Sequence, residues 1–322
     1  MHCENNQLSD FNFLKIKIKA INEFWRNFMN DFVLSCCSTV DLSAEHLAQR
    51  NISFASFHFT IDGKEYVDDL GKTMTYKEFY ANMANGSEPK TSQVNAQEFI
   101  DYFTPMLESG KDVLHISFSS GLSGTYNSAR IAKEELAEKY PDRKLLIVDS
   151  LAASSGYGLL MDKLADLRDE GKSIDELCAY AEENKLKVHH WFFATDLTFF
   201  VKGGRISKAA GWFGTALKIC PLLDVDVNGK LTPRFKIRGK NNVIKEIVNK
   251  MEEYADGGLE YAEKCYISQS ACEEDAQAVV ALIEERFPAL RGKVLVNNIG
   301  TTIGSHTGPG TVALFFFGSK RA

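Results

Sequence analysis

Polar side chains that could bind an anion gather in three stretches of this 322-residue chain, residues 90–93, 117–126 and 304–310. In the second stretch a buried apolar run ends in the letters SSGLSGT, and a helical pattern follows at once. The first N–H groups of a helix have no partner within the helix and carry partial positive charge. Such a helix end accepts a carboxylate or a phosphate, and Ser123 or Thr125 could cap it. The alternative is that these hydroxyls only cap the helix and complete the turn.

Three basic or imidazole side chains could add charge to an anion site. His306 lies in the glycine-rich third stretch, just before the last apolar run. Arg205 follows a pair of glycines, and Arg238 ends a predicted hairpin strand. Taken singly, such an arginine is usually a surface residue or part of a local ion pair, and a lone histidine is usually structural. These residues are therefore informative only in combination.

Two other chemistries use the same residues. In an esterase or thioesterase, Ser120 or Ser123 would be the nucleophile and His306 the base, on a G-x-S-x-G turn with an acid that orients the histidine. The letters SGLSG do not match that turn, and the sequence offers no evident acidic partner for His306. A sugar- or phosphate-binding module could also use the helix end. A wet polar cleft would support that module, and a tunnel of aromatic side chains would argue against it.

The elements that must position these residues alternate along the chain, which favours βαβ units and a mostly parallel sheet in an α/β fold. The predicted strands are residues 32–34, 113–118, 145–148, 188–194, 265–268, 294–296 and 312–317, with hairpins at Asp62-Gly63 and Asn228-Gly229. The predicted helices are residues 42–50, 96–108, 129–139, 157–168, 174–184, 243–254 and 275–286. In such folds ligands bind near the ends of strands, where we expect the polar stretches to form loops.

The chain is long enough for two domains. We expect an N-terminal extension over residues 1–30, an N-terminal α/β domain over residues 31–190 and a C-terminal α/β domain over residues 191–322. No linker rich in Pro, Gly or Ser marks the boundary near residue 190. The two halves should therefore pack closely, with a cleft between them.

Composition excludes several classes of function. The net charge is −6 with both signs interspersed, so no basic field attracts nucleic acid. Charged residues recur within residues 11–29, which makes that segment too polar to span a membrane, and we expect at most transient membrane contact. Seven cysteines without a CxxC pair favour unpaired thiols in a reducing, cytoplasmic compartment. The sequence has no P-loop, dinucleotide fingerprint or HExxH motif, so we predict neither a cofactor nor a metal.

The polar motifs, taken together and in order, resemble those of the DegV family. They are S-T-V-D-L-S at 38–43, T-S-Q at 91–93, S-S-G-L-S-G-T-Y at 119–126, V-D-S at 148–150, K-G-G-R-I at 202–206, G-K-L-T-P at 229–233, K-I-R at 236–238 and I-G-S-H-T-G-P-G at 303–310. The resemblance covers about residues 33–318. This chain departs from the family at Cys37, where an aspartate often precedes the Ser-Thr pair.

The resemblance implies two α/β domains that enclose one long-chain fatty acid, without a cofactor or catalytic residues. It also implies that a separate ATP-binding subunit of a bacterial fatty acid kinase phosphorylates the bound carboxylate. The residues matched to carboxylate binding are hydroxyl and glycine positions: Thr91, Ser92, Ser120, Ser123 and Gly124. The residues matched to the head-group region, where a phosphate would form, are basic or imidazole side chains: Arg205, Arg238 and His306.

A fatty-acid site is also reasonable on physical grounds. A buried carboxylate is costly unless donors replace its water, and hydroxyls and helix N–H groups are such donors. Each buried CH₂ of an acyl chain contributes about 0.8 kcal/mol. Aromatic side chains that could line a tunnel are Phe192, Phe193, Phe199, Phe200, Trp212 and Phe213. Ordinary core packing is the alternative for each of them.

Overall fold

The computed structural model describes residues 32–207 and 219–321. The predicted extension over residues 1–30 and the tunnel candidates Trp212 and Phe213 lie outside these ranges. The first half of the described chain builds a four-stranded sheet in which neighbouring strands are all parallel. Its strands, in spatial order, are β2 (Ile52–Ala55), β1 (Phe32–Cys37), β6 (Asp112–Ser117) and β7 (Leu145–Asp149).

Helices cover this parallel sheet, as an α/β fold requires. They are α2 (Ala44–Gln49), α4 (Ala96–Glu108), α5 (Thr125–Lys139), α6 (Ser155–Asp169) and α7 (Ile174–Asn184). Local signals start two of them. The Asn95 side chain accepts the Glu98 N–H and Glu98 accepts the Asn95 N–H at the start of α4, and Ser173 and Glu176 do the same for α7. Each pair is a capping box, which satisfies two N–H groups that the helix leaves free.

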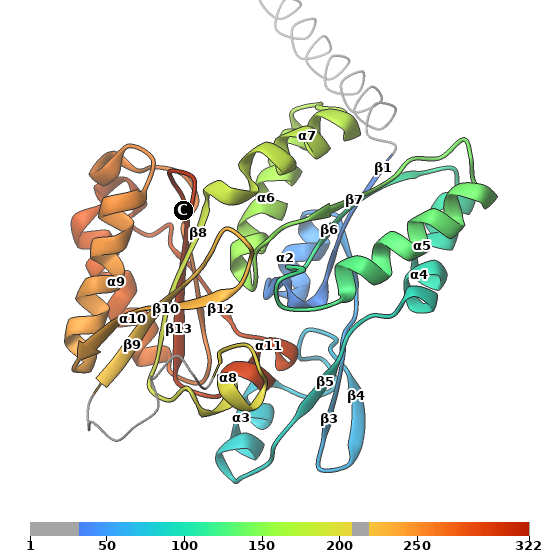
Figure 1. Ribbon diagram of the computed structural model, residues 1–322. Helices are drawn as coiled ribbons and strands as arrows, with labels where there is room; N and C mark the ends of the chain where they lie inside the picture. Colours follow the sequence, from blue (N-terminus) through green and yellow to red (C-terminus); the bar gives the residue numbers. More distant parts are fainter. Residues whose placement is uncertain (1–31, 208–218, 322) are drawn as a thin grey trace, which may run out of the picture.

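A small antiparallel sheet projects from the first half (Figure 1). It contains β4 (Lys64–Val67), β3 (His58–Ile61) and β5 (Lys90–Ser92), and α3 (Tyr76–Ala84) packs beside it. Asp62 and Gly63 both have positive φ, at 51° and 77°, as a two-residue hairpin turn requires. The predicted hairpin is confirmed. Residues 90–92 were expected in a loop, but they form β5 because they pair with β3.

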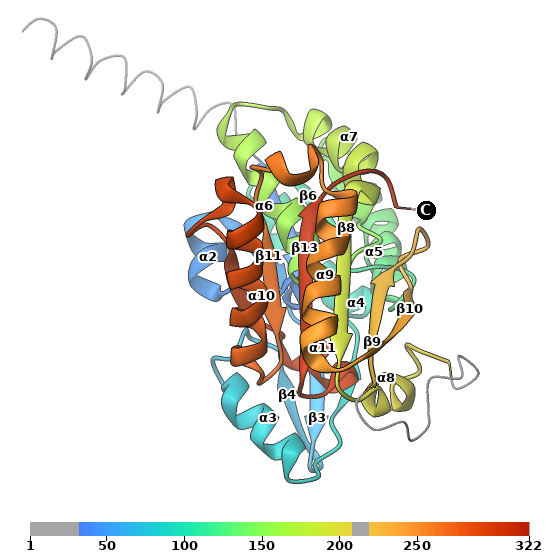
Figure 2. The same cartoon turned by 90° about the vertical axis from the view of Figure 1, so that its left-hand side faces the viewer.

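The second half builds a six-stranded mixed sheet in the order β10-β9-β8-β13-β11-β12. Only β11 and β12 pair in parallel among these described strands. The strands are β8 (Val188–Ala194), β9 (Ile219–Val225), β10 (Leu231–Arg238), β11 (Tyr266–Gln269), β12 (Leu295–Asn298) and β13 (Thr311–Phe317). Figure 2 shows α9 (Lys240–Tyr254) and α10 (Glu273–Arg286) over one face of this sheet.

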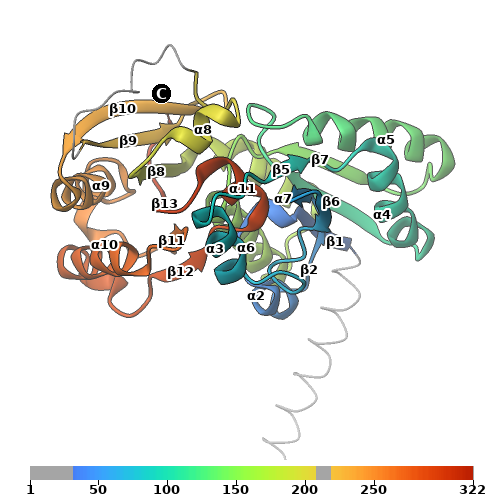
Figure 3. The same cartoon turned by 90° about the horizontal axis from the view of Figure 1, so that it is seen from below.

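Two short helices lie at the end of the second sheet that faces the small sheet. They are α8 (Thr198–Lys202) and α11 (Thr301–Thr307), and they contact each other. Figure 3 shows α11 between α8 and α3. The expectation that His306 lies in a glycine-rich loop is wrong, because His306 belongs to α11. The start of α11 is fixed by distant residues rather than by a local capping side chain.

Helix α6 joins the two halves. It packs against β1 of the first sheet and against β8, β11 and β13 of the second. The close approach of α6 to β8 depends on a glycine. A Cβ on Gly156 of α6 would lie only 2.1 Å from Nε2 of His190 on β8. One continuous cluster of buried apolar side chains extends through both sheets. The close packing expected between the halves is thus observed, while the boundary near residue 190 remains a prediction.

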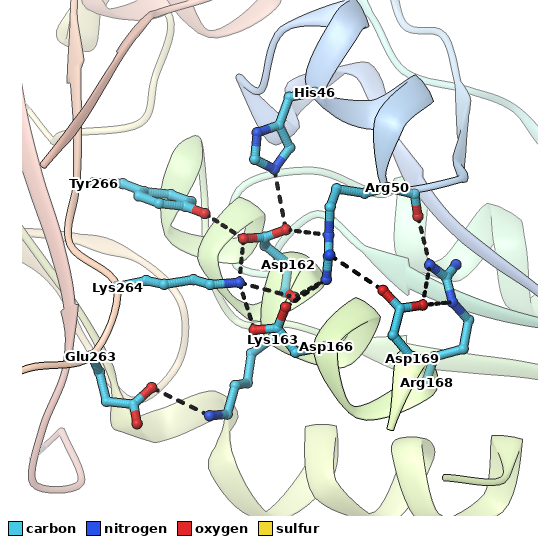
Figure 4. A network of polar contacts seen from close by, with 10 residues as sticks. All are labelled: His46, Arg50, Asp162, Lys163, Asp166, Arg168, Asp169, Glu263, Lys264 and Tyr266. Carbon is cyan, nitrogen blue, oxygen red and sulfur yellow. Dashed lines mark hydrogen bonds and ion pairs between the residues drawn. The ribbon is translucent and has the colours of Figure 1, made fainter. Parts of the chain in front are cut away.

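A charged network on α6 holds the halves together at a second place (Figure 4). The carboxylate of Asp162, whose side chain is 4% exposed, contacts Arg50 Nε at 2.8 Å and His46 Nε2 at 3.1 Å in the first half. It also accepts bonds from Lys264 and from the Tyr266 hydroxyl, at 2.5 and 2.6 Å, in the second half. Burial alone would raise the pKa of Asp162, but the bonds from His46, Lys264 and Tyr266 outweigh burial and hold this pKa below its usual range.

Candidate functional site

A cavity of about 620 Å³ lies between the two sheets. One wall is the inner face of the six-stranded sheet, where alternate residues of a strand share a face. Thr311, Ala313 and Phe315 of β13 line it, beside His190 and Phe192 of β8. The pairing of β8 with β13 sets Ala313 opposite Phe192 and Phe315 opposite His190, so this wall is continuous.

The other walls come from the first half of the chain and from α11. Phe57, Phe118, Leu122 and Ala153 supply apolar surface. Residues 302, 303, 306 and 307 of α11 also line the cavity, and this spacing places them on one side of a helix. Most of the cavity is therefore apolar, and apart from Ser154 and His190 its polar side chains come from α11, from β5 and Gln93 after it, from the residues before α5, and from Arg205 and Thr311.

The polar end of the cavity, where α11 meets β5 and the residues before α5, brings three sequence-distant motifs together. Thr91 Oγ1 lies 2.7 Å from Nε2 of His306. Ser123 Oγ lies 3.4 Å from Oε1 of Gln93 and accepts the N–H of Thr125 at 3.2 Å. Ser92, Gly124 and Arg205 complete this end: they line the same cavity. A carboxylate or phosphate placed here would meet hydroxyls, an imidazole and a guanidinium.

The start of α5 differs in one respect from the expectation. The N-cap is Gly124, not Ser123 or Thr125; Gly124 has no side chain to cap the helix, and the Ser123 hydroxyl accepts only the first N–H of the helix, that of Thr125. A side chain at Gly124 would collide with Gln93, because a Cβ there would lie 2.7 Å from Gln93 Oε1. The helix end is thus open toward the cavity, with its partial positive charge uncompensated by an acidic residue in the first turn.

The imidazole of His306 is neutral at pH 7. Burial, and then the positive charge of Arg205, lower the pKa of His306 to about 4. Its Nδ1 is buried and has no hydrogen-bond partner among the described residues. Since a bound anion would favour the charged imidazole, ligand binding should raise this pKa.

Arg205 is the cation whose charge lowers the pKa of this imidazole. Its guanidinium donates to the carbonyls of Gly203 and Leu122, at 2.6 and 3.2 Å, and within residues 32–207 and 219–321 it has no salt bridge to a carboxylate. Burial lowers the pKa of Arg205, although an arginine stays charged at any physiological pH. Its charge is therefore left for an anionic ligand.

Two buried acids hold α11 in place. Asp41 Oδ1 accepts the N–H of Gly300 at 2.9 Å, and Asp68 Oδ2 accepts the hydroxyl of Thr302 at 2.6 Å. Burial raises the pKa of both carboxyl groups. Because Gly300 and Thr302 are at the start of α11, these bonds orient the helix that carries His306.

A second hollow of about 540 Å³ adjoins the polar end. It shares Thr91, Arg205 and His306 with the first cavity, and its remaining lining includes the exposed side chains of Lys90 and Lys202. Lys202 forms a salt bridge with Glu88. The polar end of the cavity is thus continuous with a charged part of the molecular surface.

The structure brings most of the predicted site residues to the cavity. They are Thr91, Ser92, Ser123, Gly124, Arg205 and His306. It does not bring Ser120 or Arg238 there: Ser120 is exposed and its N–H donates to Asp149, and Arg238 is exposed on β10 opposite Ile219. Neither Ser120 nor Ser123 has a hydrogen bond with His306 among the described residues, so no esterase pair is formed.

The aromatic candidates are divided. Phe192 and Phe200 line the cavity, Phe199 lines the second hollow and Phe193 is packed in the core. Sequence reasoning missed the hydroxyls of Thr302 and Thr311, and it did not single out Thr307 within the polar stretch 304–310. The alternation of residues 311, 313 and 315 could have indicated Thr311. Cys37 does not line the cavity; burial raises the pKa of its thiol to about 12, and its Sγ lies 3.7 Å from His115 Nε2.

Other kinds of site find less support in the described part of the chain. No group of three or more His, Cys, Asp or Glu side chains there could hold a metal ion. None of the helices within residues 32–207 and 219–321 has the length and apolar character needed to cross a membrane. The mainly apolar walls of the cavity differ from the wet, polar cleft that a sugar-binding module would need.

Comparison with known proteins agrees with this architecture. The family model described as "Uncharacterised protein, DegV family" matches residues 37–319. A DegV domain-containing protein of Clostridium perfringens is 39% identical over 91% of this chain and 99% of its own length. A DegV family protein of Thermus thermophilus, whose structure concerns fatty acid binding, is 27% identical, with a TM-score of 0.78 over 89% of this chain and 99% of that one.

A DegV lipid binding protein of Thermotoga maritima is similar in the same way. It is 25% identical, and its structure superimposes with a TM-score of 0.76 over 91% of this chain and all of that one. The region matched by the family model, residues 37–319, includes every residue that lines the cavity and all the strands after β1. This chain therefore belongs to the DegV family.

Proposed function

We propose that this protein binds one long-chain fatty acid, with its carboxylate at the polar end and its tail in the cavity between the sheets. The observation that carries the proposal is the cavity of about 620 Å³, which is apolar along most of its walls and polar at one end. The DegV family protein of Thermus thermophilus, which binds fatty acid, supports the proposal by similarity.

The two ends of the ligand contribute differently. A tail of about 15 methylenes gains roughly 12 kcal/mol of transfer free energy on burial, before the costs of association are subtracted. The carboxylate gains little net free energy, because it gives up its water for the hydroxyls of Thr91 and Ser123 and the charge of Arg205. The tail therefore supplies affinity, and the polar end fixes the direction in which the acid binds.

We further propose that a separate ATP-binding kinase subunit phosphorylates the bound carboxylate. The second hollow supports this role, because it joins the polar end to the exposed amino groups of Lys90 and Lys202. Cations at that place would stabilise the charge that develops on a transferring phosphoryl group. In this scheme the chain presents the substrate and stabilises the charge of the transferring phosphoryl group, while the partner subunit binds the ATP. A reducing, cytoplasmic compartment suits this role, and the six described cysteines are all free.

Titration of delipidated protein with palmitate or oleate tests the binding step. Saturation at one acid per chain is expected, monitored by displacement of a fluorescent fatty acid. The kinase step is tested separately, by adding an ATP-binding fatty acid kinase subunit and measuring acyl phosphate. Failure to bind either acid would contradict the proposal as a whole, whereas binding without phosphorylation would remove only the kinase role.

A further inference from the structure

One hydroxyl in the cavity wall has no partner. Thr311 begins β13, lines the cavity and is 2% exposed. Its Oγ1 is buried and has no hydrogen-bond partner among the residues that the structure describes. Buried hydroxyls are usually bonded, because an unpartnered one has lost its water without compensation. Something outside the described chain should therefore complete this bond.

The backbone groups of Thr311 are already occupied by partners within the protein. Its N–H donates to Ser270 Oγ at 2.8 Å, and its carbonyl accepts the Ser270 N–H at 3.0 Å and the Cys272 thiol at 3.2 Å. Thr311, Ala313 and Phe315 alternate along β13 and all line the cavity, as residues on one face of a strand do.

A second hydroxyl lies near the same corner. Thr307 ends α11, is 7% exposed and also lines the cavity. Its Oγ1 has only a 3.4 Å contact with the carbonyl of Gly308, which is long for a hydroxyl bond. The cavity hydroxyls of Ser154 and Thr302 differ, because Asp41 and Asp68 bind them. Among the buried hydroxyls that line the cavity, Thr307 and Thr311 thus have unused bonding capacity.

The position of Thr311 tells which part of the ligand it meets. Thr311 pairs with Ala194, at the end of β8 that leads to α8, while Phe315 pairs with His190 at the other end. At about 3.4 Å per residue, these two ends of the wall are roughly 13 Å apart. Thr311 therefore faces the half of the acyl chain nearer the carboxylate. A saturated chain has no polar group to offer there.

We propose that Thr311, assisted by Thr307, forms a subsite for a hydroxyl group on the carboxylate-proximal half of the fatty acid. This inference rests on the proposed function and deepens it, because it makes fatty acids hydroxylated near the carboxyl group the preferred ligands. A ligand hydroxyl can both donate to and accept from the two threonines, so it completes bonds that an alkyl chain leaves open.

The test compares isomers of one acid on the delipidated full chain. The ligands are hexadecanoate, its 2-hydroxy and 3-hydroxy forms and, as a control for the distal end, 16-hydroxyhexadecanoate. Displacement of a fluorescent fatty acid gives each Kd. A proximal hydroxyl is expected to tighten binding by roughly three- to tenfold, and a terminal hydroxyl is expected to weaken it.

Thr311→Val keeps the shape of the side chain and removes its hydroxyl. In this variant the preference for the proximal hydroxyl should fall below about twofold, with hexadecanoate affinity changed by less than that. Thr60→Val, on β3 and away from the cavity lining, should keep the full preference. The melting temperature of the lipid-free Thr311→Val protein should be equal to or above that of the wild type.

Each opposite result would overturn the inference. Equal binding of all the isomers by the wild type would remove the hydroxyl subsite and leave fatty-acid binding intact. If Thr311→Val weakened hexadecanoate as much as its hydroxy forms, Thr311 would instead bind the carboxylate. A lower melting temperature of the lipid-free variant would mean that the hydroxyl has a partner within the protein. Absence of binding to every acid would remove the proposed function together with this inference.

Discussion

Replacing Ser123 by alanine should weaken fatty-acid binding by roughly ten- to a hundredfold, because a hydroxyl bond to a charged acceptor contributes about 1.5–3 kcal/mol. The structure supports the larger effect within this range. Ser123 lines the polar end, and its hydroxyl has only a 3.4 Å contact with Gln93 to give up. The hydroxyl can therefore turn to a carboxylate without losing a strong bond.

The same hydroxyl also accepts the N–H of Thr125, so a separate loss of stability is expected. That loss should be about 0.5–1 kcal/mol, as for a helix-capping side chain. Binding measured with a fluorescent fatty acid, and unfolding measured in urea, separate the two effects. The two measurements are independent, because a loss of about 1 kcal/mol in the free energy of unfolding does not change the Kd of a protein that remains folded. A higher Kd therefore reports on the carboxylate contact alone.

Ser120→Ala is the matched control. Ser120 is in the same S-S-G-L-S-G motif, but it is exposed and does not line the cavity. Its bond to Asp149 uses the backbone N–H, which alanine retains. Affinity should therefore stay within about twofold of the wild type. Equal losses of affinity in the two variants, or a loss of stability alone in Ser123→Ala, would refute the assignment of Ser123 to the carboxylate.

Three further changes test other parts of the structure. His306→Ala should spare lipid affinity but abolish acyl-phosphate formation with a partner kinase; a tenfold loss of affinity would contradict this division of roles. Asp162→Asn should lower the free energy of unfolding by about 2–3 kcal/mol in urea. Because the pKa of Asp162 is lowered in the fold, its contribution should be fully present at neutral pH and should decline progressively as pH falls below about 4, so the difference between wild type and variant should shrink over that range. Ala313→Leu should shift binding toward shorter acids, and an unchanged preference would place the tail elsewhere.

The pH dependence of stability should reveal the buried imidazole at the site. His306 has a pKa of about 4 in the fold and an ordinary value of 6.5, so the unfolded chain takes up its proton first. Stability should therefore decline as pH falls from about 6.5 to 4, and His306→Gln should reduce this slope by up to one proton. Urea unfolding at several pH values measures the slope. An identical slope in the variant would show that the imidazole is not held neutral by the fold.

The fold was predictable where the sequence pattern is local. Alternating apolar runs and helical patterns gave the parallel strands β1, β6 and β7, and the Asp62-Gly63 turn gave its hairpin. The gathering of Thr91, Ser123 and His306 was expected from the resemblance of their motifs to those of the DegV family, while the strand-end rule predicted only that their polar stretches lie near a ligand site. These residues come from three separate motifs, yet their side chains line one cavity.

The remaining features depend on contacts between distant residues. Helix α11 was not predicted, because its first turn is held by Asp41 and Asp68, which are more than two hundred residues earlier in the chain. β5 has three residues and exists as a strand only through its pairing with β3. Nothing in the K-I-R letters indicates that the side chain of Arg238 is exposed and away from the cavity.

Native mass spectrometry of the full chain tests the central claim most directly. Protein purified from cells without added lipid should carry one extra mass of roughly 230–310 Da, that of a fatty acid with about 14–20 carbons, since such a tail suits a mainly apolar cavity of this kind. Ala313→Phe, which fills the middle of the cavity wall, should lose that mass while keeping the circular dichroism spectrum of the wild type. A wild-type protein that carries no lipid and takes up neither palmitate nor oleate, or a folded Ala313→Phe protein that binds both acids as tightly as the wild type, would contradict the account.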